Sequence, residues 1–114
     1  MDLPQADHAI VAREKIAEYL LCREHPDGGS KAEFFSRFGF QLDNWQAFRR
    51  ALQNHALAHE VATVQESDFG TKYAVECTIQ TPDGREPCIR TIWILEETND
   101  APRLVTAYPQ EDVT

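Results

Sequence analysis

Apolar residues in the first half of the chain recur at the spacing of an amphipathic helix. Within residues 12–23, Ile16, Tyr19 and Leu20 fall on one face, with charged residues between them. This pattern predicts a first helix that turns these three side chains toward the core. Pro26 and the two glycines that follow it end this helix.

Two further helices are predicted before residue 59. Ser30 and Glu33 have the spacing of a capping box, so a second helix is expected to begin at Ser30. Gly39 suits the left-handed residue that follows its last turn. A third helix is expected from residue 43 or 44 to about residue 58, because one stripe of it carries Trp45, Phe48 and Leu52.

In the second half, the period changes from that of a helix to that of a strand. Residues 72–80 alternate between apolar and polar positions, and the sequence Thr81-Pro82-Asp83-Gly84 that follows is a strong turn signal. Further strands are expected at residues 60–65, 88–96 and 103–108. The chain is therefore predicted to have an α+β fold, with about three N-terminal helices packed on a four-stranded antiparallel β-meander. We expect one domain over residues 1–114, made of an irregular segment (1–10), a helical half (11–58), the sheet (59–109) and a frayed tail (110–114).

The alternation also predicts how the strands pair. Tyr73 is expected opposite Trp93, and Val75 opposite Thr91. In the next hairpin, Trp93 is expected opposite Thr106 and Thr91 opposite Tyr108. This register places Thr106 and Tyr108 on the face of Trp93, and it places Arg90 and Arg103 on the other face. A slip of one residue would exchange the two faces.

Composition narrows the class of protein. The 114 residues are 42% apolar and 26% charged, which excludes a disordered chain, a collagen-like chain and a coiled-coil rod. The apolar runs are too short for a membrane span, and residues 1–4 lack a basic and apolar signal sequence. The three cysteines are odd in number and have no C-x-x-C spacing, which indicates a reducing compartment. We therefore expect a cytoplasmic protein with no membrane association.

The charge is acidic and uneven. The formal net charge is −8, whereas residues 31–55 carry four basic and two acidic residues, or +2. A chain of this charge repels nucleic acid at long range, although a local positive face remains open to it. An acidic surface equally suits an antitoxin, an immunity protein or a regulator that binds a basic partner.

The segment from His25 to Lys31 is the most unusual stretch for chemistry. Gly28, Gly29 and Ser30 stand where a helix begins, and the unpaired amide groups of a helix N-terminus attract anions. Lys31 adds a positive charge, and His25 adds a group that titrates near neutral pH. The order of residues is not that of a P-loop. The alternative interpretation is a well-capped turn between two helices.

A second candidate lies in the last strand. Arg103, Thr106 and Tyr108, with Arg90 on the neighbouring strand, can bind a phosphate or donate protons to it. The alternative is a terminal strand of mixed polarity. His55 and His59 have the i, i+4 spacing of a metal pair but lack the H-E-x-x-H glutamate and an evident third ligand, so we predict neither a metal site nor a cofactor.

The chain resembles a known family over most of its length. The resemblance is carried by Ala9-Ile10-Val11, Lys15-Ile16, Tyr19-Leu20-Leu21, His25-Pro26-x-Gly28-x-Ser30-Lys31-Ala32-x-Phe34-Phe35, Gly39-Phe40, Trp45, Phe69-Gly70-Thr71-Lys72-Tyr73, Pro82-Asp83-Gly84-Arg85, Arg90-Thr91-x-Trp93 and the segment from Pro102 to Pro109. It is similar to an uncharacterised bacterial domain-of-unknown-function family. Members of that family occur as small free-standing proteins and as C-terminal modules of large toxin-like and haemagglutinin-like secreted proteins.

Helices followed by a four-stranded antiparallel sheet also resemble, more distantly, the barnase–EndoU–colicin–RelE-like ribonuclease toxins. That resemblance implies RNA cleavage without metal, with His25 as base or acid. Lys31, Arg90 and Arg103 would hold the phosphate, and Thr106 or Tyr108 would donate to it. Those toxins are commonly basic, and this chain departs from them with its net charge of −8.

Two functional hypotheses follow. The first is a toxin-like domain that binds or cleaves RNA, and it requires the His25–Lys31 segment and the last strand to converge in one place. The second is a non-enzymatic acidic module that binds a protein partner of the toxin–antitoxin or immunity type. The sequence leaves the oligomeric state open.

Overall fold

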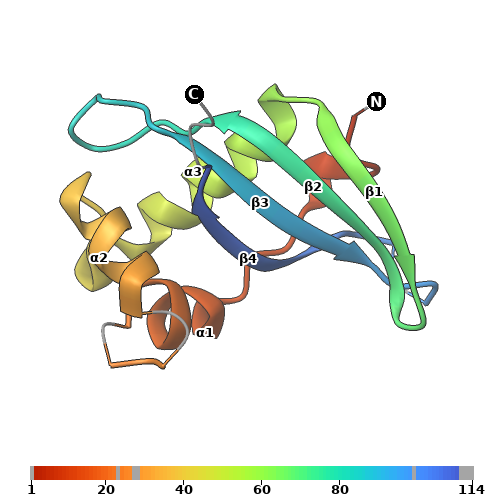
Figure 1. The fold of residues 1–114 in the computed structure, drawn as a ribbon, viewed down its shortest axis with the longest axis horizontal. Helices are drawn as coiled ribbons and strands as arrows, with labels where there is room; N and C mark the ends of the chain where they lie inside the picture. The colour runs from red at the N-terminus through yellow and green to blue at the C-terminus, as the bar shows by residue number, and fades with distance from the viewer. Residues whose placement is uncertain (1, 23, 27–28, 99, 111–114) are drawn as a thin grey trace.

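Four strands form one antiparallel sheet in chain order. The computed structural model describes residues 2–22, 24–26, 29–98 and 100–110. Strands β1 (Val61–Ser67), β2 (Gly70–Thr78), β3 (Cys88–Leu95) and β4 (Arg103–Pro109) lie in the order β1-β2-β3-β4 (Figure 1). The predicted meander is confirmed, and β2 and β3 are its central strands.

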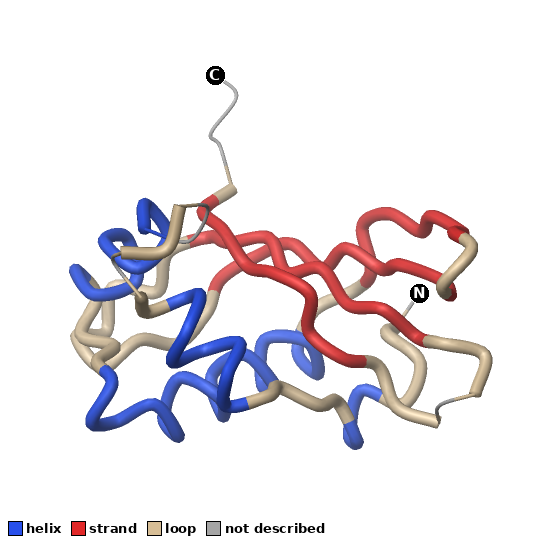
Figure 2. The backbone as a smooth tube through the Cα atoms, turned by 90° about the horizontal axis from the view of Figure 1, so that it is seen from below, coloured by secondary structure: helices blue, strands red, loops and turns tan. Residues whose placement is uncertain are grey.

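The helices lie along one face of this sheet and at one end of it (Figure 2). Helix α3 (Trp45–Ala58) crosses behind the sheet and is preceded by a 3₁₀ turn, η3 (Leu42–Asn44). Helix α2 (Gly29–Arg37) and the short helix α1 (Arg13–Lys15) lie beside the edge of the sheet that β4 forms. Another 3₁₀ turn, η1 (Ala6–His8), lies within the predicted irregular segment. The α+β fold with three helices is therefore confirmed.

The first helix is shorter than predicted. Helix α1 runs directly into a wide π-helical turn, η2 (Ile16–Leu20), in which the Leu21 amide donates to the Ile16 carbonyl at 2.8 Å. Leu21 then leaves the helical conformation (φ −117°, ψ 16°), so the helix ends three residues before the predicted limit. Wide turns of this kind are rare and often occur at functional sites.

Helix α2 begins one residue earlier than predicted. Because it starts at Gly29, Ser30 lies inside its first turn and does not precede it. The Glu33 carboxylate accepts from Arg37 at 2.7 Å, one turn further along the helix. The capping box is therefore a wrong prediction, although Gly39 (φ 101°) does end the helix in the left-handed conformation.

The core lies between the helices and the sheet. Phe35, Phe48 and Trp93 are fully buried, and rings of Phe40 and Phe48 stack with centroids 4.4 Å apart. The helical stripes supply Ile16, Leu20 and Leu52, as their spacing predicts. The sheet supplies Tyr73 and Val75 from β2, Ile89 from β3, and Leu104 and Ala107 from β4.

The strand register is partly as predicted. Tyr73 pairs with Trp93 and Val75 with Thr91, which confirms the β2–β3 register. The β3–β4 register is wrong, because Thr91 pairs with Ala107 and Trp93 with Leu104. Between Ile92 and Trp93 the register shifts, so Val105 is an extra residue in β4, a β-bulge. The bulge lets Leu104 and Ala107 both enter the core.

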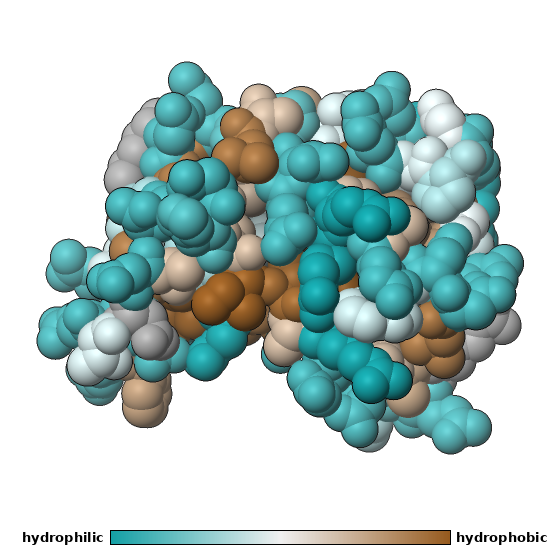
Figure 3. Space-filling model, turned by 180° about the vertical axis from the view of Figure 1, so that it is seen from behind, coloured by the Kyte–Doolittle hydropathy of each residue, from teal (hydrophilic) through white to brown (hydrophobic). Residues whose placement is uncertain are grey.

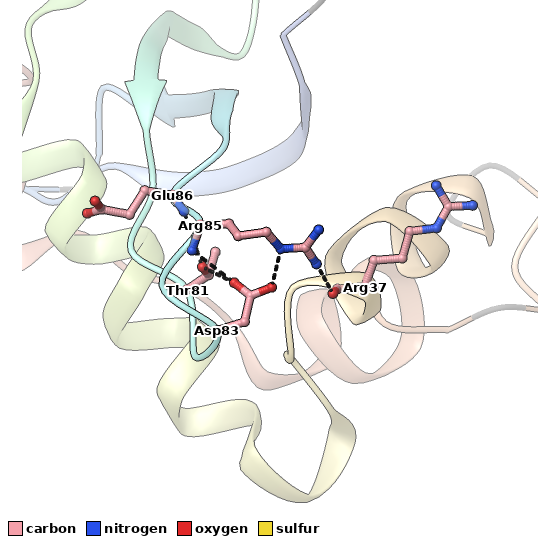
Figure 4. A network of polar contacts seen from close by, with 5 residues as sticks. All are labelled: Arg37, Thr81, Asp83, Arg85 and Glu86. Atoms are coloured by element: carbon pink, nitrogen blue, oxygen red, sulfur yellow. Dashed lines mark hydrogen bonds and ion pairs between the residues drawn. The ribbon is translucent and has the colours of Figure 1, made fainter.

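The β2–β3 loop fastens the end of α2 to the sheet (Figure 4). Arg85 donates to the Arg37 carbonyl at 2.6 Å. Its guanidinium also lies 4.4 Å from the centre of the Phe38 ring. Asp83 accepts from Thr81 and from Arg85. Slight desolvation opposes the effect of these hydrogen bonds, but together they lower the pKa of Asp83. A basic group at the C-terminal end of a helix also suits the helix dipole.

The helical side of the molecule has a mainly polar surface. Seen from behind, polar residues cover most of the helical side, and apolar residues show in smaller areas between them (Figure 3). Within the described part of the chain, no helix combines the length and apolar character needed to cross a bilayer. Of the predicted tail, residues 111–114 lie outside the described residues.

Candidate functional site

The sheet has one face that no described helix covers, which we call the open face (Figures 1 and 2). Residues paired across antiparallel strands point to the same side of a sheet. The pairs Glu76–Arg90 and Arg90–Tyr108 therefore lie on one face, together with Thr106, two residues from Tyr108. This face is opposite to that of Trp93, so the predicted separation of Arg90 from Thr106 and Tyr108 is wrong. The corrected register brings these three residues together.

Tyr19 connects the open face to the segment before α2. Its hydroxyl lies 3.0 Å from Thr106 Oγ1, where either oxygen can be the donor. The His25 ring meets the Tyr19 ring edge-on, with centroids 4.9 Å apart. Lys31 Nζ lies over the same ring, 5.3 Å from its centre. We call Tyr19, His25, Lys31 and Thr106 the Tyr19 cluster.

Local structure explains this convergence. The π-helical turn η2 carries Tyr19, with Ile16 and Leu20 of the same turn fixed in the core. The Gly29 amide donates to the His25 carbonyl at 2.9 Å, which joins the His25 backbone to the start of α2. Lys15 Nζ lies 5.2 Å from the Tyr19 ring centre, so a second cation approaches the cluster. Cations near an aromatic face are stabilised by its quadrupole.

Arg90 belongs to a polar network that crosses the open face. Arg90 NH1 lies 3.2 Å from Glu76 Oε1, and its NH2 donates to Thr63 Oγ1 at 3.3 Å. Glu76 also accepts from Gln110 at 2.7 Å. Arg90 Nε is buried and has no hydrogen-bond partner among the described residues. Arg90 is thus held in place beside Tyr108, with its charge balanced by Glu76.

Arg103 lies at the other end of β4. Its NH2 donates to Glu96 at 2.6 Å. Together with Tyr19 and Lys15 it lines a groove of about 690 Å³ between the first helix and the sheet. The β-bulge places Arg103 on the open face, because Arg103 pairs with Ile94, two residues from Ile92. Of the Tyr19 cluster, Tyr19 itself therefore lines the same groove as Arg103.

The other sequence-predicted residues are less central. Gly29 lies in the first turn of α2, and Ser30 beside it is exposed. Gly28 lies outside the described residues, so its predicted part in anion binding stays a prediction. Tyr19 itself was expected only to pack in the core, and its helical spacing gives no sign of a polar contact. Only the fold shows that its hydroxyl reaches β4.

The two histidines of the metal motif face the sheet backbone. His55 is 2% exposed, with Nδ1 3.1 Å from the Thr78 carbonyl oxygen and Nε2 3.3 Å from that of Val75. His59 Nε2 lies 2.9 Å from the Thr78 oxygen. Burial lowers the pKa of His55, against the hydrogen bonds to Thr78 and Val75, which raise it. Within the described ranges, no three His, Cys, Asp or Glu side chains gather as metal ligands would.

The Tyr19 cluster combines three kinds of chemistry in one place. His25 carries an imidazole, a side chain that can act as a general base or a general acid. Lys31 is a cation that can stabilise a phosphate in its transition state. Tyr19 and Thr106 are hydroxyl donors that hold each other in position. These are the components of general acid–base catalysis at an anionic substrate.

The amino-acid sequence matches one protein-family model over nearly its whole length. A family model described as a domain of unknown function, DUF6883, matches residues 2–111. The chain belongs to the DUF6883 family. The expected membership of a domain-of-unknown-function family is thus confirmed at that level. No curated protein sequence matches this DUF6883 domain.

A solved structure has a similar fold. It is described as a contact-dependent growth inhibition toxin–immunity protein complex from Klebsiella pneumoniae 342. The similarity covers 89% of the DUF6883 domain and 99% of the matched chain, with a TM-score of 0.70 and 11% sequence identity. At this identity, the comparison shows a shared fold.

Proposed function

We propose that this domain is a toxin-like domain that binds and cleaves RNA without a metal ion. The observation that carries the proposal is the convergence of His25, Lys31 and Thr106 on Tyr19. These residues come from the segment before α2, from α2, from β4 and from the first helix. The fold shared with a chain of a growth inhibition toxin–immunity complex supports the same class of function.

The proposed reaction is transfer of a phosphodiester to the neighbouring 2′-hydroxyl. His25 takes the proton of the 2′-hydroxyl, whose oxygen attacks phosphorus as the bond from phosphorus to O5′ breaks. The Tyr19 hydroxyl gives a proton to O5′ and recovers one from solvent, and His25 releases to solvent the proton that it took. The products are a 2′,3′-cyclic phosphate and a 5′-hydroxyl. Lys31 balances the charge that builds up on the phosphate oxygens.

Arg90, Tyr108 and Arg103 extend this site along the open face. Arg90 and Tyr108 lie beside each other on β3 and β4, and Thr106 is two residues from Tyr108. Arg103 lines the groove that Tyr19 also lines. In the proposal, Arg90 and Arg103 hold phosphates next to the one that is cleaved, and Tyr108 donates a hydrogen bond to the substrate.

The test is an RNA-cleavage assay with matched variants. His25→Ala is expected to lower the cleavage rate by about 10²–10⁴-fold, the usual contribution of a general base. Lys31→Ala is expected to lower it by about 10²-fold, as for loss of one stabilising donor. His8→Ala is the control, because His8 is 69% exposed, lies 3.5 Å from Asp7 and belongs to η1. Equal degradation by the wild type and His25→Ala would identify a contaminating nuclease and overturn the proposal.

The alternative is a non-enzymatic protein-binding module of the immunity or antitoxin type. The net charge of −8 favours it, since such a surface suits a basic partner. Expression in a bacterial cell separates the two functions. A toxin arrests growth, and His25→Ala relieves the arrest, whereas an immunity-type module leaves growth unchanged and binds its partner with salt-sensitive affinity.

A further inference from the structure

The groove beside the Tyr19 cluster has a defined wall, floor and far end. Tyr19 and Lys15 of the first helix form one wall. Ile94 and Val105 of the sheet belong to the floor. At the far end lies Phe69, from the turn between β1 and β2, which is 78% exposed. The groove therefore runs from the Tyr19 ring to a second aromatic ring.

The turn that carries Phe69 is held firmly against β3. Ser67 Oγ donates to the Gly70 carbonyl at 2.7 Å and accepts from the Phe69 amide at 3.4 Å. Gly70 has a φ of 138°, and a Cβ there would lie 2.5 Å from the Leu95 carbonyl oxygen. The backbone of this turn and that of β3 thus approach as closely as glycine allows. An exposed aromatic ring on such a backbone is positioned in advance for a flat ligand.

Two cations lie in a row across the floor. Lys72 on β2 pairs with Ile94 on β3, and Ile94 pairs with Arg103 on β4, so Lys72 and Arg103 flank Ile94 on the open face. Arg103 meets Glu96 through NH2, and a guanidinium has five N–H donors in all. Three cations and three carboxylates line the groove. It is thus neutral in a chain whose net charge is −8, which makes it favourable to an anion relative to the rest of the molecule.

We infer that this groove binds an unpaired nucleotide next to the cleaved phosphodiester, with its base on Phe69 and its phosphate between Lys72 and Arg103. The inference rests on the proposed function and names its substrate class as single-stranded RNA. An exposed ring stacks on the flat face of a base, and that face is available only when the base is out of a duplex. Phe69 is then a residue that selects unpaired RNA and takes no part in the chemistry.

Cleavage kinetics test this inference on a single-stranded RNA and on a fully paired RNA hairpin. Phe69→Ala is expected to raise KM for the single strand about tenfold, with kcat little changed, because one stacked base contributes binding of this order. Phe69→Trp keeps a stacking ring and is expected to restore KM. Lys72→Gln is expected to raise KM in the same way. Leu57→Ala and Arg50→Gln, exposed residues of α3, are the apolar and charged controls.

A binding experiment separates this inference from the proposed function. The probe is a fluorescein-labelled six-nucleotide 2′-O-methyl RNA, which lacks the attacking hydroxyl and cannot be cleaved. Binding that Phe69→Ala weakens and Leu57→Ala does not would support the groove even if the wild type has no nuclease activity. Cleavage with the same KM for Phe69→Ala and the wild type, or equal use of paired RNA, would overturn the inference and leave the proposed function standing. Failure of the wild type both to bind and to cleave would overturn both.

Discussion

Tyr19 both packs against the core and belongs to the proposed site. Its ring contacts His25 and Lys31, and its hydroxyl contacts Thr106. The sequence pattern predicts that Tyr19 faces inward, because it follows Ile16 at helical spacing. The pattern cannot predict that Thr106 of the last strand lies beside the Tyr19 hydroxyl. Contacts between segments 87 positions apart depend on the tertiary fold.

Tyr19→Phe removes only the hydroxyl of the cluster. The variant keeps the ring against His25 and Lys31, so we expect it to lose about 1 kcal/mol of unfolding free energy, the worth of one hydrogen bond. We expect its RNA cleavage rate to fall about 10²-fold, because the proposed proton donor to O5′ is lost. Urea unfolding and cleavage kinetics measure the two effects. Tyr73→Phe, on the core face of β2, is the control, and equal cleavage by both variants would contradict the role of Tyr19.

His55 makes the stability of the fold depend on pH. Burial lowers the pKa of His55 from the usual 6.5. Below pH 6.5, the unfolded chain therefore binds a proton at His55 more readily than the folded chain does. The contribution of His55 is therefore complete above about pH 6.5 and is lost as the pH falls through the lowered value. We expect urea unfolding of the wild type to give a smaller free energy at pH 5.5 than at pH 7.5.

The control for this prediction is a pair of histidine variants. His55→Gln can still donate to the Thr78 carbonyl and does not titrate, so the drop between pH 7.5 and 5.5 is expected to shrink. His8→Gln changes an exposed histidine and is expected to keep the full drop. Parallel pH curves for the wild type and His55→Gln would show that His55 is not responsible.

At the scale of elements, the strand order and the β2–β3 pairing were predictable because alternation is clear on both sides of the turn. Tyr73 and Val75 alternate with Lys72, Ala74 and Glu76, so only one register buries the apolar set. The stretch Leu104-Val105-Thr106-Ala107 has no such alternation, because Val105, the extra residue of the bulge, is apolar and follows the apolar Leu104. The sequence led to the hypothesis that the last strand lies close to His25 and Lys31. The geometry of this approach could not be predicted while the register of β4 was open.

Glycine at the β1–β2 turn is expected to be required for packing as well as for conformation. Gly70→Ala and Gly84→Ala both place a side chain at positive φ, 138° and 79° respectively. A new Cβ at Gly70 also meets the Leu95 backbone, whereas at Gly84 it meets nothing within 4 Å. We expect Gly84→Ala to cost about 1–2 kcal/mol and Gly70→Ala clearly more, from urea midpoints. Equal costs would mean that the turn does not press against β3.

At the scale of the whole molecule, the negative net charge repels RNA, whereas the cations of the proposed site attract it. The domain carries a net charge of −8 and measures 35 × 31 × 24 Å. At about 0.01 M salt the screening length is roughly 30 Å, so an approaching RNA meets the charge of the entire domain. At about 0.1 M it is roughly 10 Å, and the RNA meets chiefly the nearby cations.

Added salt is therefore expected to raise the association rate of a short RNA with this domain, unlike the rate for a basic RNA-binding protein. Stopped-flow fluorescence with the 2′-O-methyl probe between 0.01 M and 0.15 M salt measures it. An association rate that falls steadily over this range would mean that the local cations dominate at all distances. The acidic total by itself favours a protein partner, so composition gives no sign of the local cations on which the proposed RNA function depends.

The bulge at Val105 links the two sides of β4. In an unbroken strand, residues three apart point in opposite directions. Leu104 and Ala107 are three apart and both buried, and Arg103 and Thr106 are three apart and both on the open face. Deleting Val105 would straighten β4, and the chain would then have to bury either Arg103 or Thr106, or expose one of the two core residues. One inserted residue thus allows the same strand to complete the interior and to present both polar groups outward, and a relative without that insertion could keep this architecture only by giving up one of the two.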